Sequence, residues 1–194
     1  MIPGAHILAG FTLGFRYRKQ LAAIIRQTPL GHTLLNFDPT ALASEGVAVL
    51  ALDFDGVLAP HGQTEPLPEM QEWLSACAAV FGEARMVVLS NKPTDERRAW
   101  FARHHPGMRF ISGVRKKPYP DGLNKTGELC GVPLSSVMMV DDRLLTGCLA
   151  ALIAGCRPCY IRKPYISLRQ RPLAESFFAL LRRIERLYIR TLCP

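Results

Sequence analysis

The sequence lacks a hydrophobic run long enough to cross a lipid bilayer. The longest apolar stretch near its N-terminus, residues 7–15, is interrupted by two glycines and a threonine and ends at Arg16. A membrane-spanning helix needs about 20 predominantly apolar residues, so this stretch is too short to be one. Two interpretations of it stay open: contact with the surface of a membrane, and packing against the rest of the protein.

The sequence also lacks the cysteine spacing of a disulfide framework and the small-residue cleavage site of a secretory signal peptide. We therefore expect a protein of the reducing cytoplasm. Cys156 and Cys159 have the spacing of half a zinc site, but neither a second pair nor a matching histidine pattern accompanies them. They are interpreted as residues that pack in a strand.

Acidic residues are in the minority, with 16 Asp and Glu against 24 Lys and Arg and a net charge of +8. The excess lies in residues 157–194, which hold nine basic residues and two acids, whereas residues 47–156 hold eleven and twelve. Such a basic region suits an anionic partner, or it simply keeps the protein soluble. Aromatic residues make up only 8%, which disfavours the stacking platforms of single-strand readers, so nucleic acid is not the expected partner.

The sequence has no internal repeat or linker, and its length suits one domain. After residue 46, short apolar runs alternate with longer amphipathic stretches. The predicted strands cover residues 47–54, 86–89, 136–140 and 158–161, with a weaker candidate at 108–111. The predicted helices cover residues 68–81, a segment capped by Thr94, residues 121–130 and residues 144–154. This alternation predicts a single α/β domain with a three-layer architecture, a parallel sheet covered on both faces, whose working edge lies at the carboxyl ends of the strands.

The two ends of the chain flank this arrangement. Residues 1–46 are predicted to pack on the core as an N-terminal segment with a helix near residues 17–26, and residues 47–194 to form the core, closing with a basic helix at residues 173–192. The apolar stripe of that last helix consists of Leu173, Phe177, Leu180, Leu181, Ile184, Leu187 and Tyr188. We expect the stripe to pack on the domain, with Arg182, Arg186 and Arg190 facing solvent. Docking of the helix on a membrane surface is the alternative.

Two acidic residues end the first predicted strand, where Asp53 and Asp55 stand in the sequence DFDGVL. Alone, such a pair can simply shape a turn, and a calcium-binding loop is excluded because position 57 is valine. Polar pairs follow three later strands or loops: Ser90-Asn91, Lys116-Lys117 and Asp141-Asp142. Because the carboxyl ends of parallel strands meet at one edge, these residues are predicted to converge on one site.

These residue types suit the hydrolysis of a phosphate ester. Asp53 can attack phosphorus as a nucleophile, which divides one slow reaction into two easier steps, and Asp55 can act first as acid and then as base. Mg²⁺ is the expected cofactor, with Asp53 and Asp142 as side-chain ligands and Asp55 as a ligand through its backbone carbonyl. The expected contacts to the substrate phosphate are Ser90, Asn91 and Lys117.

The succession DFDGVL, LSN, KKP and VDDRLLTG resembles the haloacid dehalogenase superfamily of aspartyl-phosphate phosphatases over about residues 30–192. The resemblance implies a Rossmann-like three-layer fold and the site roles given above. It matches the family lysine to Lys117 rather than to Lys116, because Pro118 follows.

One position departs from that pattern. The family usually carries a second acid five residues after the metal-binding aspartate, and after Asp142 this position is Gly147. Asp141 is a candidate to compensate by orienting a metal-bound water.

The stretches between the motifs leave room for a strand and a helix and no more, so we expect a capless enzyme with an open site. The C-terminal third resembles the YqeG-type branch, subfamily IIIA, which includes phosphatidylglycerophosphate phosphatases. That branch implies a lipid phosphate as substrate. The basic last helix and the apolar N-terminal segment agree with a lipid-facing enzyme, for which we expect peripheral contact with the inner face of an anionic membrane. Two alternatives stay open: a capless phosphatase of soluble or nucleic-acid phosphates, and a catalytically silent scaffold or partner-binding domain. The sequence does not specify an oligomeric state.

Overall fold

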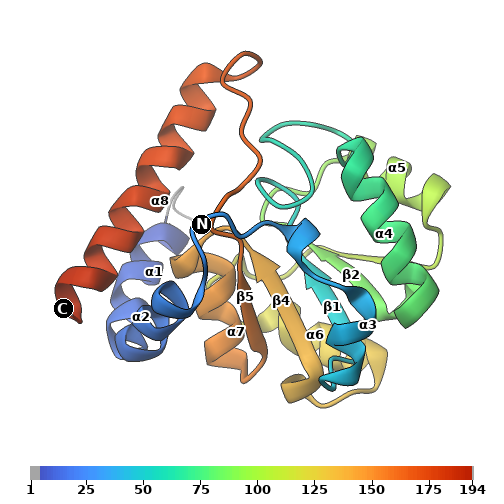
Figure 1. Ribbon diagram of the computed structural model, residues 1–194, viewed down its shortest axis with the longest axis horizontal. Helices are drawn as coiled ribbons and strands as arrows, with labels where there is room; N and C mark the ends of the chain where they lie inside the picture. Colours follow the sequence, from blue (N-terminus) through green and yellow to red (C-terminus); the bar gives the residue numbers. More distant parts are fainter. Residues whose placement is uncertain (1–4, 194) are drawn as a thin grey trace.

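A five-stranded, all-parallel sheet forms the centre of the protein, as the alternating pattern predicts (Figure 1). The structure is a computed structural model that describes residues 5–193. The strands are β1 (Val49–Leu52), β2 (Met86–Leu89), β3 (Arg109–Ile111), β4 (Val137–Asp141) and β5 (Arg157–Tyr160). Their spatial order is β3-β2-β1-β4-β5, so the chain winds outward from β1 in one direction and then returns to wind outward in the other.

The central strand is apolar on both faces because helices cover both. Leu50 and Leu52 point into one core cluster, whereas Val49 and Ala51 point into the other. The strand predicted at residues 47–54 is shorter than expected at both ends. After Asp53 the chain turns, since the N–H groups of residues 57–59 donate to the carbonyl of Phe54 rather than to a neighbouring strand.

One face of the sheet is covered by α3 (Pro39–Ser44), α4 (Pro68–Phe81) and α5 (Asp95–His104). Helix α4 has the bounds that Pro68 and Gly82 predict, and it buries Met70 and Leu74. Thr94 caps α5 as expected, because its hydroxyl accepts a hydrogen bond from the N–H of Arg97.

The opposite face is covered by α6 (Asp121–Cys130) and α7 (Leu149–Ala154). The single helix predicted at residues 144–154 is instead two pieces, a π-helical turn η4 (Leu144–Cys148) followed by α7. The short 3₁₀ turns of the described chain include η1 (Leu34–Asn36), η2 (Glu83–Arg85) and η3 (Leu134–Ser136).

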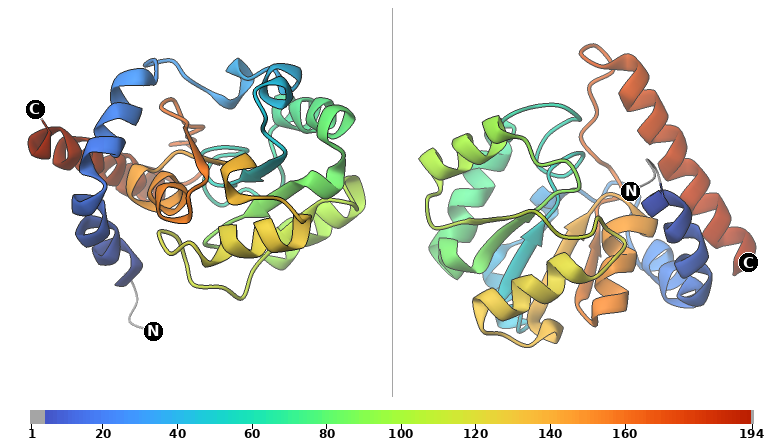
Figure 2. Two further views of the ribbon diagram at one scale, coloured as in Figure 1. Left: turned by 90° about the horizontal axis from the view of Figure 1, so that it is seen from below. Right: turned by 180° about the vertical axis from the view of Figure 1, so that it is seen from behind.

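Three helices from the two ends of the chain lie together beyond β5: α1 (Ala5–Arg16), α2 (Arg18–Gln27) and α8 (Pro172–Leu192) (Figures 1 and 2). The sequence pattern missed α1, because glycine is a poor helix former. Gly10 and Gly14 are nevertheless required, since a Cβ atom on either would lie within 3 Å of an atom of Leu145. None of the described helices is both long and apolar enough to cross a membrane.

The orientation of α8 differs from the expectation. Its apolar stripe was expected to pack on the domain. Leu181 and Tyr188 do so, but Leu173, Phe177, Leu180, Ile184 and Leu187 are exposed. Arg182 was expected to face solvent, and it is only 3% exposed. The reason is that α8 turns a polar face inward, where Glu175, Arg182 and Glu185 find buried partners near the carboxyl edge of the sheet.

Candidate active site

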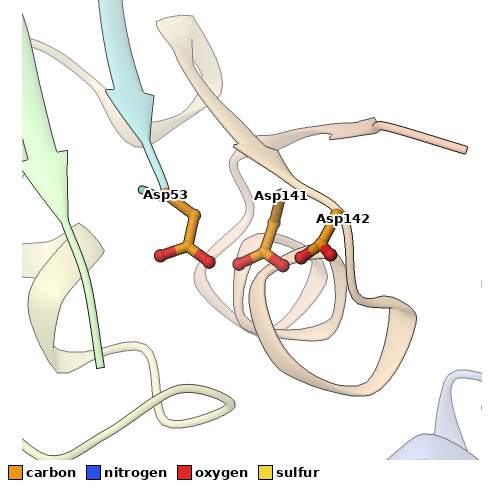
Figure 3. A group of neighbouring side chains, drawn as sticks. All are labelled: Asp53, Asp141 and Asp142. Atoms are coloured by element: carbon orange, nitrogen blue, oxygen red, sulfur yellow. The ribbon is translucent and has the colours of Figure 1, made fainter. Parts of the chain in front are cut away.

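The carboxyl ends of β1 and β4 are the point at which the strand order reverses, and there the connections leave toward opposite sides of the sheet. In open parallel sheets such a point forms a crevice that binds ligands. Asp53 follows β1 directly, Asp141 is the last residue of β4, and Asp142 is the next. Figure 3 shows the three carboxylates side by side beyond the strand ends.

The three aspartates form one buried acidic cluster in the described part of the chain. One carboxylate oxygen of each lies within 4.8 Å of the others. Lys117 enters from the loop after β3, and its Nζ atom lies 3.1 Å from Oδ1 of Asp53 and 2.5 Å from Oδ2 of Asp141. The fold therefore brings together residues that are up to 89 positions apart in the chain, from Asp53 to Asp142, as the sequence pattern predicts.

Burial changes the protonation of this cluster. It raises the pKa of Asp53 to about 8, although the charge of Lys117 opposes the rise. Burial also raises the pKa of Asp142, against the opposing charge of Arg182. Burial alone would lower the pKa of Lys117, but the charges of Asp141 and Asp53 outweigh it and the pKa of the lysine is raised. The acids are thus only partly neutralised by protein cations, which suits a site for an additional cation.

The donor set fits a hard divalent cation such as Mg²⁺. Oxygen ligands from one or two carboxylates are what Mg²⁺ prefers, with water completing its shell. Asp53, Asp141 and Asp142 offer such oxygens within a span that one ion can bridge. The carbonyl of Asp55, the third ligand expected from the sequence, belongs to the turn that follows Asp53.

The carboxylate of Asp55 is fixed by an arginine that sequence reasoning missed. Two guanidinium nitrogens of Arg97 donate to its two oxygens at 2.6 and 3.0 Å, and the N–H of Gly62 donates to one of them at 3.2 Å. Arg97 is itself buried, and it lies over the ring of Phe54 at 3.9 Å from the ring centre. Asp55 keeps 15% of its side chain exposed, so it can reach a ligand while Arg97 holds its direction.

Asn91 lines the cavity and also bonds to the backbone of Lys117. Its amide nitrogen donates to the carbonyl of Lys117 at 3.2 Å, and its amide oxygen accepts from the N–H of Lys117 at 2.8 Å. Both polar ends of the side chain therefore position the lysine. Ser90 is buried beside it and lines the cavity described next. Of the two neighbouring lysines, Lys117 is buried against Asp53 and Lys116 is exposed.

A cavity of about 360 Å³ opens in front of these residues. Its wall includes six residues singled out from the sequence: Asp53, Asp55, Ser90, Asn91, Lys117 and Asp142. It also includes the cationic side chains of Lys116, which belongs to the KKP motif, and of Lys92 and Arg171, which the motifs did not indicate. Acids around one point, with several cationic side chains elsewhere in the wall, can hold a cation and an anionic group together.

A family comparison agrees with this geometry. The family model described as "Hydrolase: haloacid dehalogenase-like hydrolase" matches residues 14–155, well over half of the chain. The chain belongs to the haloacid dehalogenase-like hydrolases. Members of this family typically use a metal ion, and the buried aspartate cluster is compatible with one.

Two solved structures are similar to this haloacid dehalogenase-like hydrolase. One is an uncharacterized protein from Corynebacterium glutamicum ATCC 13032 Kitasato, with 21% identity, coverage of 70% of this chain and 95% of that chain, and a TM-score of 0.46. The other is a Had-superfamily hydrolase from Ehrlichia chaffeensis, with 14% identity, coverage of 69% and 97%, and a TM-score of 0.38. No curated protein matches the sequence.

The departure at Gly147 has a steric explanation in this member of the haloacid dehalogenase-like hydrolases. A Cβ atom at position 147 would lie 2.0 Å from Oδ2 of Asp141 and 2.3 Å from its Cβ, which no structure tolerates. Asp141 thus occupies the space that a side chain at 147 would need. Its oxygens accept hydrogen bonds from Lys117, from the N–H of Arg143 and from the hydroxyl of Thr146.

The other residues missed by sequence reasoning come from the loop after β1 and from α8. His61 stacks on Phe178 with ring centres 4.0 Å apart, and its Nδ1 atom lies 3.2 Å from the buried carboxylate of Glu175. His61, Arg171 and Phe178 all line the cavity. No motif marks them, because their positions depend on how α8 docks. The one signal in the sequence was the presence of charged residues, among them Glu175, Arg182 and Glu185, in the same helix as the apolar stripe of α8.

Proposed function

We propose that this hydrolase is a Mg²⁺-dependent phosphomonoesterase that works through an aspartyl-phosphate on Asp53. The observation that carries the proposal is the placement of Asp53. Its carboxylate projects from the strand end into the cavity, 3.1 Å from the ammonium of Lys117 and within one ion's span of two further aspartates. A nucleophile, a fixed cation and a set of metal ligands are thus gathered at one point.

In the first step, an oxygen of Asp53 forms a bond to phosphorus and the bond from phosphorus to the leaving oxygen breaks. Asp55 in its protonated form gives its proton to that oxygen, and the alcohol leaves. In the second step, Asp55 takes a proton from water, the water oxygen attacks phosphorus, and the aspartyl-phosphate bond breaks. Inorganic phosphate is released, and Asp53 and Asp55 return to their starting states.

The surrounding side chains stabilise this chemistry from fixed positions. Lys117 cannot move away, because Asn91 holds its backbone and Asp141 holds its ammonium group. It therefore provides positive charge that is already oriented when negative charge builds up on phosphate oxygens. The hydroxyl of Ser90 provides a hydrogen bond at the cavity wall. Mg²⁺, when bound by the aspartates, supplies further positive charge for the phosphate oxygens.

As substrate we propose a lipid phosphomonoester, specifically phosphatidylglycerophosphate. The stretches between motifs hold one helix and one strand each, with no inserted cap, so the site stays open to a substrate too large to be enclosed. Lys92, Lys116 and Arg171 add positive charge to the wall, which suits a substrate with more than one phosphate. The resemblance to the YqeG-type branch supports the same substrate.

The test is phosphate release from phosphatidylglycerophosphate in detergent micelles, beside a panel of soluble phosphomonoesters. Each assay is run with Mg²⁺, with EDTA, and with the Asp53→Asn protein. Release from the lipid that needs Mg²⁺ and is lost in Asp53→Asn supports both reaction and substrate. Release only from soluble esters keeps the reaction and rejects the lipid. No release from any compound rejects the reaction and favours a catalytically silent domain.

A further inference from the structure

Helix α8 carries an apolar stripe that no other described residue covers. It consists of the five exposed members of the stripe predicted from the sequence, spaced three or four residues apart on one side of the helix: Leu173, Phe177, Leu180, Ile184 and Leu187. Their exposed fractions run from 41% to 87%. A contiguous apolar surface of this kind on a soluble protein marks an interaction site.

The stripe cannot turn inward, because the opposite face of α8 is fixed by buried polar contacts. Glu185 is 1% exposed and accepts hydrogen bonds from the guanidinium of Arg143 and from the N–H of Leu144. Glu175 is fully buried and accepts from the N–H groups of His61 and Ser167. Rotating the helix would break these contacts and leave charges buried without partners, which costs several kcal/mol.

The charges on the outward side of α8 are all positive. Its two acids, Glu175 and Glu185, are the buried ones. Arg183 and Arg190 are exposed and lie along one margin of the apolar stripe, whereas Arg186 is half-buried and donates to the hydroxyl of Tyr160. An apolar stripe with a margin of arginines is the pattern of a helix that lies in the interface of an anionic membrane.

We propose that α8 docks this protein on an anionic lipid surface, with the apolar stripe among the acyl chains and the arginines on the headgroup phosphates. A second copy of the chain fits less well, since pairing two such faces would bring like charges together. Neighbouring α1 adds to the surface: its Phe11 contacts Tyr188 of α8, and its Leu8 and Phe15 remain exposed.

Docking would set the active site at the level of the headgroups. The N-terminal half of α8 rises past the carboxyl edge of the sheet (Figure 1), and Arg171, Ala174 and Phe178 form part of the cavity wall. The same helix thus provides both the membrane contact and one side of the site. This step rests on the proposed lipid phosphatase function, whereas the docking itself does not.

The experiment measures binding to two kinds of vesicle, phosphatidylcholine alone and phosphatidylcholine mixed with phosphatidylglycerol, by flotation of the full-length protein. One variant combines Leu180→Ser with Leu187→Ser, and a second combines Arg183→Gln with Arg190→Gln. The controls replace exposed residues of the same chemical kind on other helices: Val80→Ser with Leu129→Ser, and Arg98→Gln with Arg103→Gln.

The wild-type protein should prefer the mixed vesicles. The leucine variant should lose affinity roughly tenfold or more, and the arginine variant roughly 30-fold for mixed vesicles alone. Both controls should bind as the wild type does. The proposal would be overturned if the wild-type protein does not bind mixed vesicles, or if the α8 variants bind them as well as their controls do. A dimer in light scattering that dissociates in the leucine variant would also overturn it, in favour of a second copy.

Activity assays distinguish a failure of the proposed membrane docking from a failure of the proposed phosphatase function. With Mg²⁺ and p-nitrophenyl phosphate, the α8 variants should match the wild type, while their release of phosphate from lipid in mixed vesicles should fall with their binding. Wild-type protein that binds vesicles but hydrolyses neither compound keeps the docking and rejects the phosphatase function. Wild-type protein that hydrolyses the soluble ester but does not bind vesicles keeps the phosphatase function and rejects the docking.

Discussion

The guanidinium of Arg182, on the C-terminal helix, lies against the carboxylate of Asp142, with Nε 2.5 Å from Oδ2. Both side chains are almost fully buried. Nη2 of Arg182 also lies 2.5 Å from the same oxygen, so the guanidinium and the carboxylate form a buried ion pair. The helix proposed to contact the membrane is therefore bonded directly to a proposed metal ligand.

Replacing Arg182 by glutamine should destabilise the metal-free protein more than the metal-bound protein. Removing one partner of a buried ion pair costs about 3–5 kcal/mol, because the other charge is left alone. A bound cation would compensate Asp142 in place of the arginine. Thermal unfolding should thus show a larger rise of Tm on adding Mg²⁺ for Arg182→Gln than for the wild type. The exposed neighbour Arg183→Gln is the control, and an equal Mg²⁺ effect in all three proteins would contradict the prediction.

Asp53→Asn should abolish hydrolysis and yet raise the Tm of the protein in EDTA. The pKa of Asp53 is about 8 in the folded protein, whereas the ordinary pKa of an aspartate, which applies in the unfolded chain, is 3.8. Between these values the unfolded chain has lost a proton that the folded chain retains, so the stability of the wild type falls as pH rises through this window. Asparagine does not titrate. The Tm advantage of Asp53→Asn should therefore grow from pH 5 to about pH 8, and level off above it. An advantage that is constant with pH would contradict this account.

Gly147→Asp should impair the protein, and a second change should repair it. The new side chain collides with Asp141, and overpacking of this kind costs about 1–3 kcal/mol. Removing the obstruction in the double variant Asp141→Gly with Gly147→Asp should restore part of the lost Tm and of the phosphatase activity. Gly31→Ala is the control, because a Cβ atom there meets no other atom within 4 Å. A double variant that is no better than Gly147→Asp alone would disprove the exchange of space between the two positions.

Arg97→Lys should lower kcat while leaving the binding of Mg²⁺ unchanged. Lysine keeps the charge, but it cannot donate two parallel hydrogen bonds to Asp55 as the guanidinium does. Misdirection of an acid and base group typically costs a factor of about 10²–10⁴ in rate. The measurements are kcat on a soluble phosphomonoester and the Mg²⁺ dependence of Tm. A rise in KM without a change in kcat would show that Arg97 serves substrate binding instead.

The local pattern of the sequence was enough to predict most of the α/β core. Helix α4 begins at Pro68 and ends at Phe81 before Gly82, and β2 covers the MVVL run, in both cases as predicted. These elements follow from capping, chain stops and burial on both faces, which are properties of neighbouring residues. The same reasoning missed α1, whose glycines make sense only beside Leu145.

The candidate site was predictable as a set because of a rule of topology. Polar residues at the ends of parallel strands share an edge, so Asp53, Lys117 and Asp142 could be grouped although they are distant in sequence. The sequence did not show which hydrogen bonds fix the position of each of these side chains. Arg97 on Asp55 and Asn91 on Lys117 are contacts between separate loops, and spacing along the chain carries no information about them.

The sequence by itself determined the alternation of strands and helices in the core after residue 46, the motif residues and the excess of positive charge near the C-terminus, since these depend on residue type and short-range periodicity. Only the tertiary structure decided which side of α8 faces the protein. Hydrophobic periodicity predicts that Leu180 and Leu187 are buried, but the pairing of Glu185 with Arg143 and of Arg182 with Asp142 turns them outward. A buried charge without its partner costs more than two exposed leucines, so the polar contacts set the orientation of the helix.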